Sequence, residues 1–318
     1  MKNTHEKILK LLTKSNAIIS GERLGEKLCI SRAAVSKSVK ELKNRGWNIE
    51  TISNLGYKLD KTQDILSGSV IEGEIENLGY HVKVIYHQTI GSTNTWAKEN
   101  ISELPSVAII TSEEQTAGRG RFNRQFYSPK ATGVYMSVVI KECEKIKNKN
   151  ITCIAAIAVK EVIAELLGKE VGIKWVNDIY LEEKKVCGIL TEGIMDMESK
   201  TLSSVVIGIG LNIATSEFPG DVAPIASNVD INQKKSRNCW IASIYCRILK
   251  LLENDIVEVM KKYKAASIVL GKEVMVYSGE REIMGKALDI DLEGALTILT
   301  KDGTLETFNS GEVSLKRC

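Results

Sequence analysis

The sequence predicts a multidomain α+β protein, with a winged helix-turn-helix at the N-terminus, a mixed α/β domain in the centre and short strands at the C-terminus. Its 318 residues allow two or three domains. Residues 1–62 show three helical stripes and one hairpin signal, and residues 65–268 show apolar strands set apart from helices. Residues 270–318 read as short strands at 273–277, 282–289, 295–299 and 305–308, joined by turns. These three stretches are the predicted domains.

The N-terminal helices are predicted from apolar periodicity and from helix caps. Ile8, Leu11 and Leu12 form the stripe of a first helix, and Ser20 and Ser31 cap a second and a third. A hairpin follows, with strands at 47–52 and 57–59 around an Asn/Gly turn. Helix, short helix, tight turn, helix and hairpin make a winged helix-turn-helix.

The third helix predicts a DNA-binding face. It buries one side and presents polar or basic side chains on the other, as a recognition helix does in a major groove. The expected DNA contacts are Arg32, Ser36, Lys37 and Lys40 on the helix and Lys58 on the wing. The alternative is a three-helix packing or dimerisation module with ordinary surface lysines.

The charge distribution supports DNA binding by the first unit alone. The net charge of the chain is +3, but residues 1–62 hold 13 Lys and Arg against 6 Asp and Glu, a formal charge of +7. The remaining residues carry −4. A basic unit on a slightly acidic body indicates that only this unit meets a polyanion.

The central segment is predicted from alternating short strands and helices. The expected strands are 82–86, 108–110, 134–139, 171–176, 178–181, 185–192 and 203–210, and one long helix is expected at about 239–264. Strands that follow each other mostly through hairpins favour α+β over a doubly wound sheet.

Composition disfavours several functional classes. No run of 18 apolar residues occurs and the N-terminus is polar, so we expect a cytoplasmic protein with no membrane span. The seven cysteines form no Cys-x-x-Cys pair, which favours buried free thiols over disulfides or zinc. None of the three histidines has metal-ligand spacing, and a Ser-His-Asp triad would need one of them.

Four polar segments interrupt the central framework. They are Ser92-Thr93-Asn94, the arginine- and glycine-rich residues 115–124, residues 174–178 with Lys185 and Gly188, and Gly208-x-Gly210-x-Asn212. Arginine presents bidentate donors to carboxylate or phosphate, and glycine lets backbone N–H groups approach the same anion. Together they suit a loop that closes over a nucleotide and an acid.

Each segment also has a plainer interpretation. Ser92 is a common N-cap, a lone Gly-Arg-Gly is common in solvated loops, and Lys184-Lys185 after two glutamates is typical of a charged hairpin tip. None of the four segments is decisive alone, so the prediction depends on their joint occurrence.

In combination and order, the four segments resemble the biotin protein ligase family. Gln-Thr-Ala-Gly-Arg-Gly-Arg-x-x-Arg at 115–124 is similar to its biotinyl-adenylate loop. Residues 174–178 resemble its Lys-Trp-Pro-Asn-Asp motif, with valine in place of proline. Lys185-x-x-Gly188, Gly208-x-Gly210-x-Asn212 and Ser92-Thr93-Asn94 match the remaining motifs.

The resemblance implies the fold and function of the bifunctional family members. It implies a class II synthetase-like ligase domain, a C-terminal SH3-like β-barrel and repression of biotin genes. The activity would be ATP- and Mg²⁺-dependent formation of biotinyl-5′-AMP, then transfer of biotin to a lysine of a biotin carboxyl carrier protein. Other expected partners are operator DNA and, when liganded, a second copy of the chain.

The resemblance also implies roles for the site residues. The catalytic residues would be Lys185, Arg119 and Arg121. Biotin would contact Ser92, Thr93, Asn94, Gln115, Gly118, Arg119, Gly120, Arg121, Lys185 and Gly188. ATP would contact Arg121, Arg124, Asn177, Asp178, Lys185 and Asn212, and Mg²⁺ would lie near Asp178 and Asn212.

Two alternatives to this function remain at the level of the sequence. One is a biotin-sensing transcription factor without catalysis, which Lys185 and the complete arginine-glycine loop argue against. The other is a lipoate-type ligase, which a competition between biotin and lipoate would distinguish.

Overall fold

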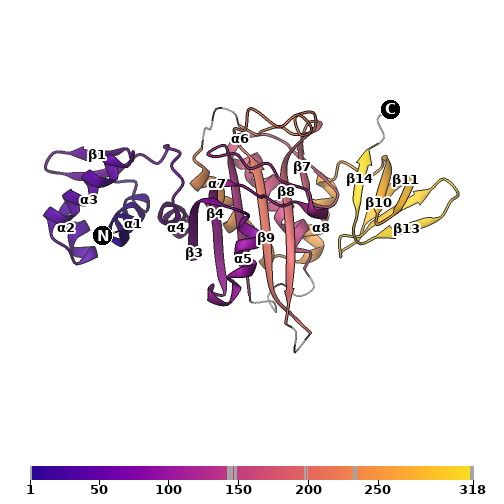
Figure 1. Ribbon diagram of the computed structural model, residues 1–318, viewed down its shortest axis with the longest axis horizontal. Helices are drawn as coiled ribbons and strands as arrows, with labels where there is room; N and C mark the ends of the chain where they lie inside the picture. Colours follow the sequence, from indigo (N-terminus) through magenta and orange to yellow (C-terminus); the bar gives the residue numbers. More distant parts are fainter. Residues whose placement is uncertain are drawn as a thin grey trace.

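A computed structural model describes residues 2–141, 146, 149–196, 198, 200–230, 232 and 235–315. Figure 1 shows three units in a row, with the N-terminal unit and the C-terminal sheet on opposite sides of a central sheet. The predicted bounds of the three domains, 1–62, 65–268 and 270–318, stay a prediction.

The N-terminal unit is the predicted winged helix-turn-helix. Helices α1 (Lys2–Thr13), α2 (Gly21–Leu28) and α3 (Arg32–Asn44) precede the hairpin of β1 (Ile49–Ile52) and β2 (Gly56–Leu59). Ser20 and Ser31 cap α2 and α3 by accepting from the amides of Arg23 and Ala34. A core that includes Ile8, Leu24, Val35, Val39 and Leu42 closes the unit.

Helix α4 (Gly68–Asn77) joins this unit to the centre. Lys10 of α1 lies 3.0 Å from Glu72 and 2.6 Å from Glu76 of α4, and Val70 belongs to the N-terminal core. Apolar contact and ion pairs therefore fix α1 against α4.

The central domain is a seven-stranded sheet with helices beside it. Its strands are β3 (Lys83–Ile90), β4 (Val107–Gln115), β5 (Gly133–Ile140), β6 (Gly172–Lys174), β7 (Asp178–Leu181), β8 (Lys184–Met195) and β9 (Leu202–Asn212). Their order is β3-β4-β5-β9-β8-β7-β6, and only the β3–β4 pair is parallel. This confirms the predicted mixed α/β domain.

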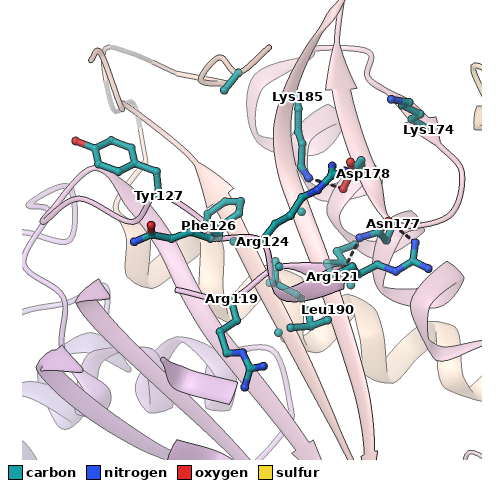
Figure 2. A pocket seen from close by; sticks show the side chains of 18 of the residues that line it. Arg119, Arg121, Arg124, Phe126, Tyr127, Lys174, Asn177, Asp178, Lys185 and Leu190 are labelled. Atoms are coloured by element: carbon teal, nitrogen blue, oxygen red, sulfur yellow. Dashed lines mark hydrogen bonds and ion pairs between the residues drawn. The ribbon is translucent and has the colours of Figure 1, made fainter. Parts of the chain in front are cut away.

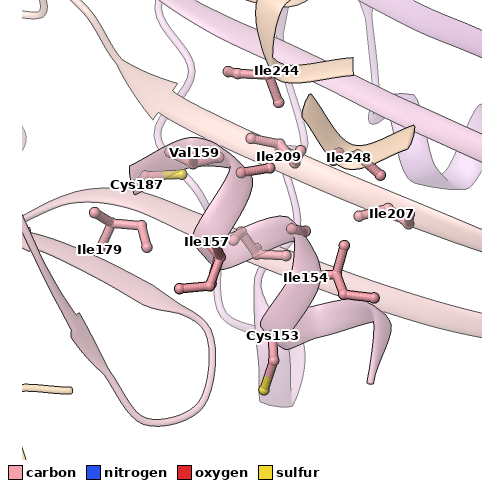
Figure 3. Packing of buried hydrophobic residues seen from close by; sticks show 14 of the residues in the cluster. Cys153, Ile154, Ile157, Val159, Ile179, Cys187, Ile207, Ile209, Ile244 and Ile248 are labelled. Carbon is pink, nitrogen blue, oxygen red and sulfur yellow. The ribbon is translucent and has the colours of Figure 1, made fainter. Parts of the chain in front are cut away.

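The helices of this domain are α5 (Thr93–Glu99), α6 (Ile151–Leu167), α7 (Arg237–Glu253) and α8 (Ile256–Ala266), with short 3₁₀ turns at Ile101–Glu103 and Arg121–Asn123. Figure 3 shows Ile154 and Ile157 of α6 among Ile207 and Ile209 of β9 and Ile244 of α7. The main core therefore lies between these helices and the sheet.

The prediction of a single helix at 239–264 is wrong, because the structure has two helices there. The chain reverses between α7 and α8, where Asn254 is extended and Asp255 caps α8 by accepting from Val257 N at 2.7 Å. Lys149 Nζ donates to Leu252 O at 2.6 Å, which satisfies one carbonyl at the end of α7.

The C-terminal sheet is antiparallel and five-stranded, in the order β13-β12-β11-β10-β14. Strands β10 (Glu273–Ser278), β11 (Arg281–Ile290), β12 (Leu296–Thr300) and β13 (Leu305–Phe308) were predicted, but β14 (Glu312–Leu315) was not. Trp175 Nε1 donates to Gly294 O at 2.9 Å and ties this sheet to the central domain. No helix in the described part of the chain is long and apolar enough to cross a membrane.

Candidate functional site

A cavity of roughly 370 Å³ opens where the central and C-terminal units meet. That volume lies within the range of small-molecule sites. Thirteen of the predicted site residues line it, namely Ser92, Thr93, Asn94, Gln115, Arg119, Gly120, Arg121, Arg124, Asn177, Asp178, Lys185, Gly188 and Asn212. Gly118 does not line it, because its position is packed against Phe126 O, 2.4 Å from where a Cβ would stand.

One end of the cavity is neutral and polar. The backbone N and the Oγ1 of Thr93 lie 2.9 and 3.1 Å from Gln115 Oε1, and Gln115 Nε2 donates to Ser128 Oγ at 2.9 Å. Ser92 caps α5 through Thr95 N, so the plainer N-cap interpretation also holds for this residue. Amide and hydroxyl groups arranged in this way can read a neutral head group that both donates and accepts hydrogen bonds.

Asn94 forms the buried floor beneath that pair. Its Nδ2 donates to Leu190 O at 3.1 Å and to Glu192 Oε2 at 2.8 Å, and its Oδ1 accepts from Ser137 Oγ at 2.6 Å. A Cβ at Gly208 would stand 2.4 Å from Asn94 Oδ1. The glycine therefore serves close packing in the floor of the site.

The other end of the cavity is cationic and centres on Lys185. Its Nζ lies 2.6 Å from Asp178 Oδ1 on the neighbouring strand β7, and the two side chains converge in Figure 2. Lys185 also lies over Gly188, where a Cβ would come 3.2 Å from Nζ. The glycine three residues later thus leaves room for the lysine side chain. Lys185 does lie just after the β7–β8 hairpin turn, as the hairpin-tip interpretation has it, but its side chain lines the cavity.

The three arginines of the loop point in different directions. Arg124 reaches toward Asp178 and pairs with Glu312 at 2.6 Å, whereas Arg119 turns away and donates to Asn123 Oδ1 at 3.0 Å (Figure 2). Arg121 Nη1 lies 3.0 Å from Gly311 O. The structure therefore brings Arg121 and Arg124 to the C-terminal sheet and leaves Arg119 apart from Lys185.

Burial lowers the pKa of two cations of the site. Desolvation lowers the pKa of Lys174 and of Arg121, and Asp178 partly opposes the effect on both. Lys174 also lies 5.4 Å from the centre of the Tyr180 ring, and the pKa of Tyr180 is raised to about 12 by burial. A half-buried cluster with more cations than carboxylates attracts anions.

Asn177 and Asn212 lie at the expected nucleotide end. Asn177 Nδ2 donates to Ile189 O at 2.8 Å, and its Oδ1 is 3.3 Å from Arg121 Nη1. Asn212 Nδ2 donates to Ser227 O at 3.1 Å, while its buried Oδ1 has no hydrogen-bond partner among the described residues. An unpartnered buried acceptor at a cavity wall is suited to a ligand or an ion.

Sequence reasoning missed the aromatic and C-terminal parts of the wall. Phe126 and Phe218 line the cavity, as do Tyr277 and residues 311–314 of the C-terminal sheet. Alternating residues after Gly311 were the available signal for β14, but four residues are a weak strand pattern.

The predicted DNA face is separate from the cavity. Arg32, Ser36, Lys37 and Lys40 are exposed along α3, and Lys58 is exposed on β2, whereas Val35 and Val39 of α3 are buried. In the part of the chain that the structure describes, none of these four cations has an ion-pair partner within 4.0 Å. They are free to meet phosphate.

Comparisons with known proteins agree with this arrangement. Family models match an HTH domain at residues 4–58, the biotin/lipoate A/B protein ligase family at 84–212 and the biotin protein ligase C terminal domain at 269–316. The bifunctional ligase/repressor BirA of Bacillus subtilis is 32% identical over 309 residues, 93% of either chain. BirA of Escherichia coli is 28% identical over 93% of this chain and 92% of its own.

A solved structure shows the same fold. The biotin protein ligase from Aquifex aeolicus in complex with biotin and ATP has a TM-score of 0.63 and 28% identity, over 74% of this chain and 99% of its own. Fold and cavity define a protein ligase of the biotin/lipoate class that carries a helix-turn-helix domain. More particularly, the chain belongs to the biotin protein ligase family, with the bifunctional ligase/repressor BirA proteins as full-length relatives.

Proposed function

We propose that the chain is an ATP-dependent biotin protein ligase and a DNA-binding repressor of biotin genes. It makes biotinyl-5′-AMP and transfers biotin to a lysine of a biotin carboxyl carrier protein. The observation that carries the proposal is a single cavity with a neutral pair, Thr93 and Gln115, at one end and Lys185 with two arginines at the other. A ligand with a polar ring and an acidic tail fits both ends.

In the first step, an oxygen of the biotin carboxylate attacks the α-phosphorus of ATP. A bond forms between the carboxylate oxygen and the α-phosphorus. The bond between the α-phosphorus and the oxygen that bridges to the β-phosphate breaks, and pyrophosphate leaves. Both reactants are anions, so fixed cations lower the barrier by offsetting their repulsion and holding them in line.

Lys185 is positioned to bridge the two acids. Its Nζ, now 2.6 Å from Asp178 Oδ1, would turn from that carboxylate to the biotin carboxylate and α-phosphate oxygens. Arg121 and Arg124 hold phosphate oxygens, and Arg124 leaves Glu312 to do so. Arg119 reaches the acids only when residues 115–124 rearrange, which agrees with a loop that closes over the adenylate.

The described residues fit Mg²⁺ only as an ion carried by the nucleotide. No cluster of three His, Cys, Asp or Glu that could hold a metal occurs among them, whereas Asn212 Oδ1 is a buried acceptor without a partner. Asn212 and Asp178 would hold the ion together with phosphate oxygens and water. When bound, it would neutralise charge on the phosphates.

In the second step, the neutral ε-amine of the acceptor lysine attacks the acyl carbon of biotinyl-5′-AMP. An amide bond forms, the acyl–phosphate bond breaks and AMP leaves, with loss of a proton from the amine. Water must be kept from the mixed anhydride until then, and the loop together with residues 311–314 supplies the cover.

The direct test is to incubate the protein with ATP, Mg²⁺ and biotin and to detect biotinyl-5′-AMP by mass. Lys185→Ala should greatly reduce the product formed in a short incubation, and Lys184→Ala on the exposed side of the same strand should retain it. Equal product from both variants would contradict the role of Lys185. A preference for lipoate over biotin in ATP–pyrophosphate exchange would instead overturn the substrate.

The repressor function depends on the exposed face of α3. Lys37 and the wing residue Lys58 contact DNA phosphate or base edges, and two liganded copies place two such faces on a two-part operator. We include the homodimer and a cytoplasmic location in the proposal. Gel-shift of biotin-operator DNA with and without biotin and ATP tests it, and equal affinity in both conditions would remove the ligand-dependent part.

A further inference from the structure

Arg237 is a buried arginine that the proposed reaction does not use. It is the first residue of α7, and its side chain is 2% exposed. Its Nε donates to Asp64 Oδ2 at 2.8 Å, and its Nη1 donates to Glu113 Oε2 at 2.6 Å. A buried guanidinium is tolerated only with compensating carboxylates, so these three side chains act as one unit.

The first carboxylate partner of Arg237, Asp64, lies in the segment that follows the winged helix-turn-helix. The amide of Arg237 donates to Asp64 Oδ1 at 2.7 Å. The next residue, Asn238, donates to Ile65 O at 2.7 Å and accepts from Ser67 N at 2.9 Å. Both carboxylate oxygens of Asp64 and the backbone up to Ser67 are therefore fastened to the start of α7, just before α4 begins.

The other carboxylate partner of Arg237, Glu113, lies on β4, the strand that carries Gln115. Glu113 lies two residues before Gln115, so the two side chains are held by the same end of one strand, Glu113 against α7 and Gln115 against the start of α5. Gln115 accepts from Thr93 at the neutral end of the cavity. The guanidinium of Arg237 thus lies between the end of β4 that carries Gln115 and the linker to the DNA-binding unit.

We infer that Arg237 is a positioning residue that couples Gln115 to the linker at residues 64–67. Occupancy of the neutral end of the cavity fixes β4, and Glu113 passes this restraint through Arg237 to Asp64. Coupling of this kind is reciprocal, so restraint of the linker also favours ligand binding. The inference rests on the proposed function, because it takes biotin as the ligand of that end.

The test breaks one of these two ion pairs of Arg237 at a time in the full-length protein. Glu113→Gln removes the charge on the strand side, and Asp64→Asn removes it on the linker side. Glu161→Gln is the matched control, because Glu161 also accepts from an arginine of α7, Arg247, at 2.6 Å without touching β4 or the linker. The readouts are biotin KM and kcat, and hydrogen exchange of the Ser67 amide with and without biotin.

In the unmodified protein, biotin should slow exchange at Ser67. Glu113→Gln should raise the KM for biotin about tenfold, with kcat changed by less than about twofold, and should abolish the slowing. Asp64→Asn should also abolish the slowing and, because the coupling is reciprocal, should raise the KM for biotin by about threefold. Glu161→Gln should change neither.

The coupling is wrong if biotin still slows exchange at Ser67 in both variants, or if the Glu161→Gln control loses the effect equally. Should Glu113→Gln fail to fold, Asp64→Asn alone decides through the Ser67 amide. Absence of biotinyl-5′-AMP with the unmodified protein would overturn the proposed function itself. Normal adenylate formation with a Ser67 amide insensitive to biotin would overturn only the coupling.

Discussion

Replacing Gly210 by alanine should push Phe126 into the cavity. Gly210 of β9 and Gly188 of β8 lie directly opposite each other, and the Phe126 ring rests on this pair of glycines. A Cβ at Gly210 would stand 2.4 Å from Phe126 Cε1 and 2.6 Å from Cζ. Ordinary carbon contacts are about 3.5–4.0 Å, so the ring must retreat by about 1 Å.

The magnitude follows from overpacking. Forcing one methyl group into a packed site costs about 1–3 kcal/mol. For a domain of this size, a loss of about 2 kcal/mol lowers Tm by about 4–8 °C. Because Phe126 lines the cavity, we also expect the KM for biotin to rise about tenfold, which corresponds to about 1.4 kcal/mol.

Two variants make the assay specific. Gly220→Ala is the control, because no heavy atom lies within 4 Å of a Cβ at that position, and it should leave Tm and KM unchanged. Phe126→Leu added to Gly210→Ala should restore much of the lost Tm, because it removes the ring atoms that clash. If the double variant melts no higher than Gly210→Ala alone, steric conflict with Phe126 is not the cause.

Three further outcomes are expected. Lys185→Ala should slow adenylate formation about 10²–10³-fold in single-turnover assays with little change in Tm. Lys37→Ala should weaken operator binding and, if it contacts phosphate, lower the salt slope by about one, without changing adenylate formation. Although burial opposes it, hydrogen bonds from Lys98 and Asn94 hold the pKa of Glu192 below its usual value. Ionised Glu192 therefore stabilises the fold at pH values above its unfolded pKa, and this stabilisation is lost as pH falls through its folded pKa. Between pH 7 and acid, the Tm of Glu192→Gln should therefore fall less steeply than the Tm of the unmodified protein.

The N-terminal unit could be predicted because its signals are local. Ser20 and Ser31 cap α2 and α3 as expected, and Val35 and Val39 are buried on the expected face of α3. Each of these signals spans only a few residues, within one helix or turn. The chain reversal at Asp255 is different, because the apolar pattern continues into α8 and periodicity alone does not register a change of direction.

The motifs of the cavity could be predicted, but the partners of their side chains could not. Lys185 and Asp178 were both expected to contact ATP, and the two are ion-paired. Arg124 pairs with Glu312, which lies 188 residues further along the chain. No local pattern encodes such a pair, because it arises only when the C-terminal sheet docks on the central domain. The catalytic and binding roles themselves stay a prediction.

The central domain and the C-terminal sheet share the cavity wall, and this matters for protein engineering. A fusion or an exchange of modules between relatives would naturally be cut between α8 and β10. Such a cut divides one cavity wall between two parents, since Ser92 comes from one side and Ser314 from the other. A chimaera joined there inherits two half-pockets that were never selected together, so both halves should be taken from the same donor.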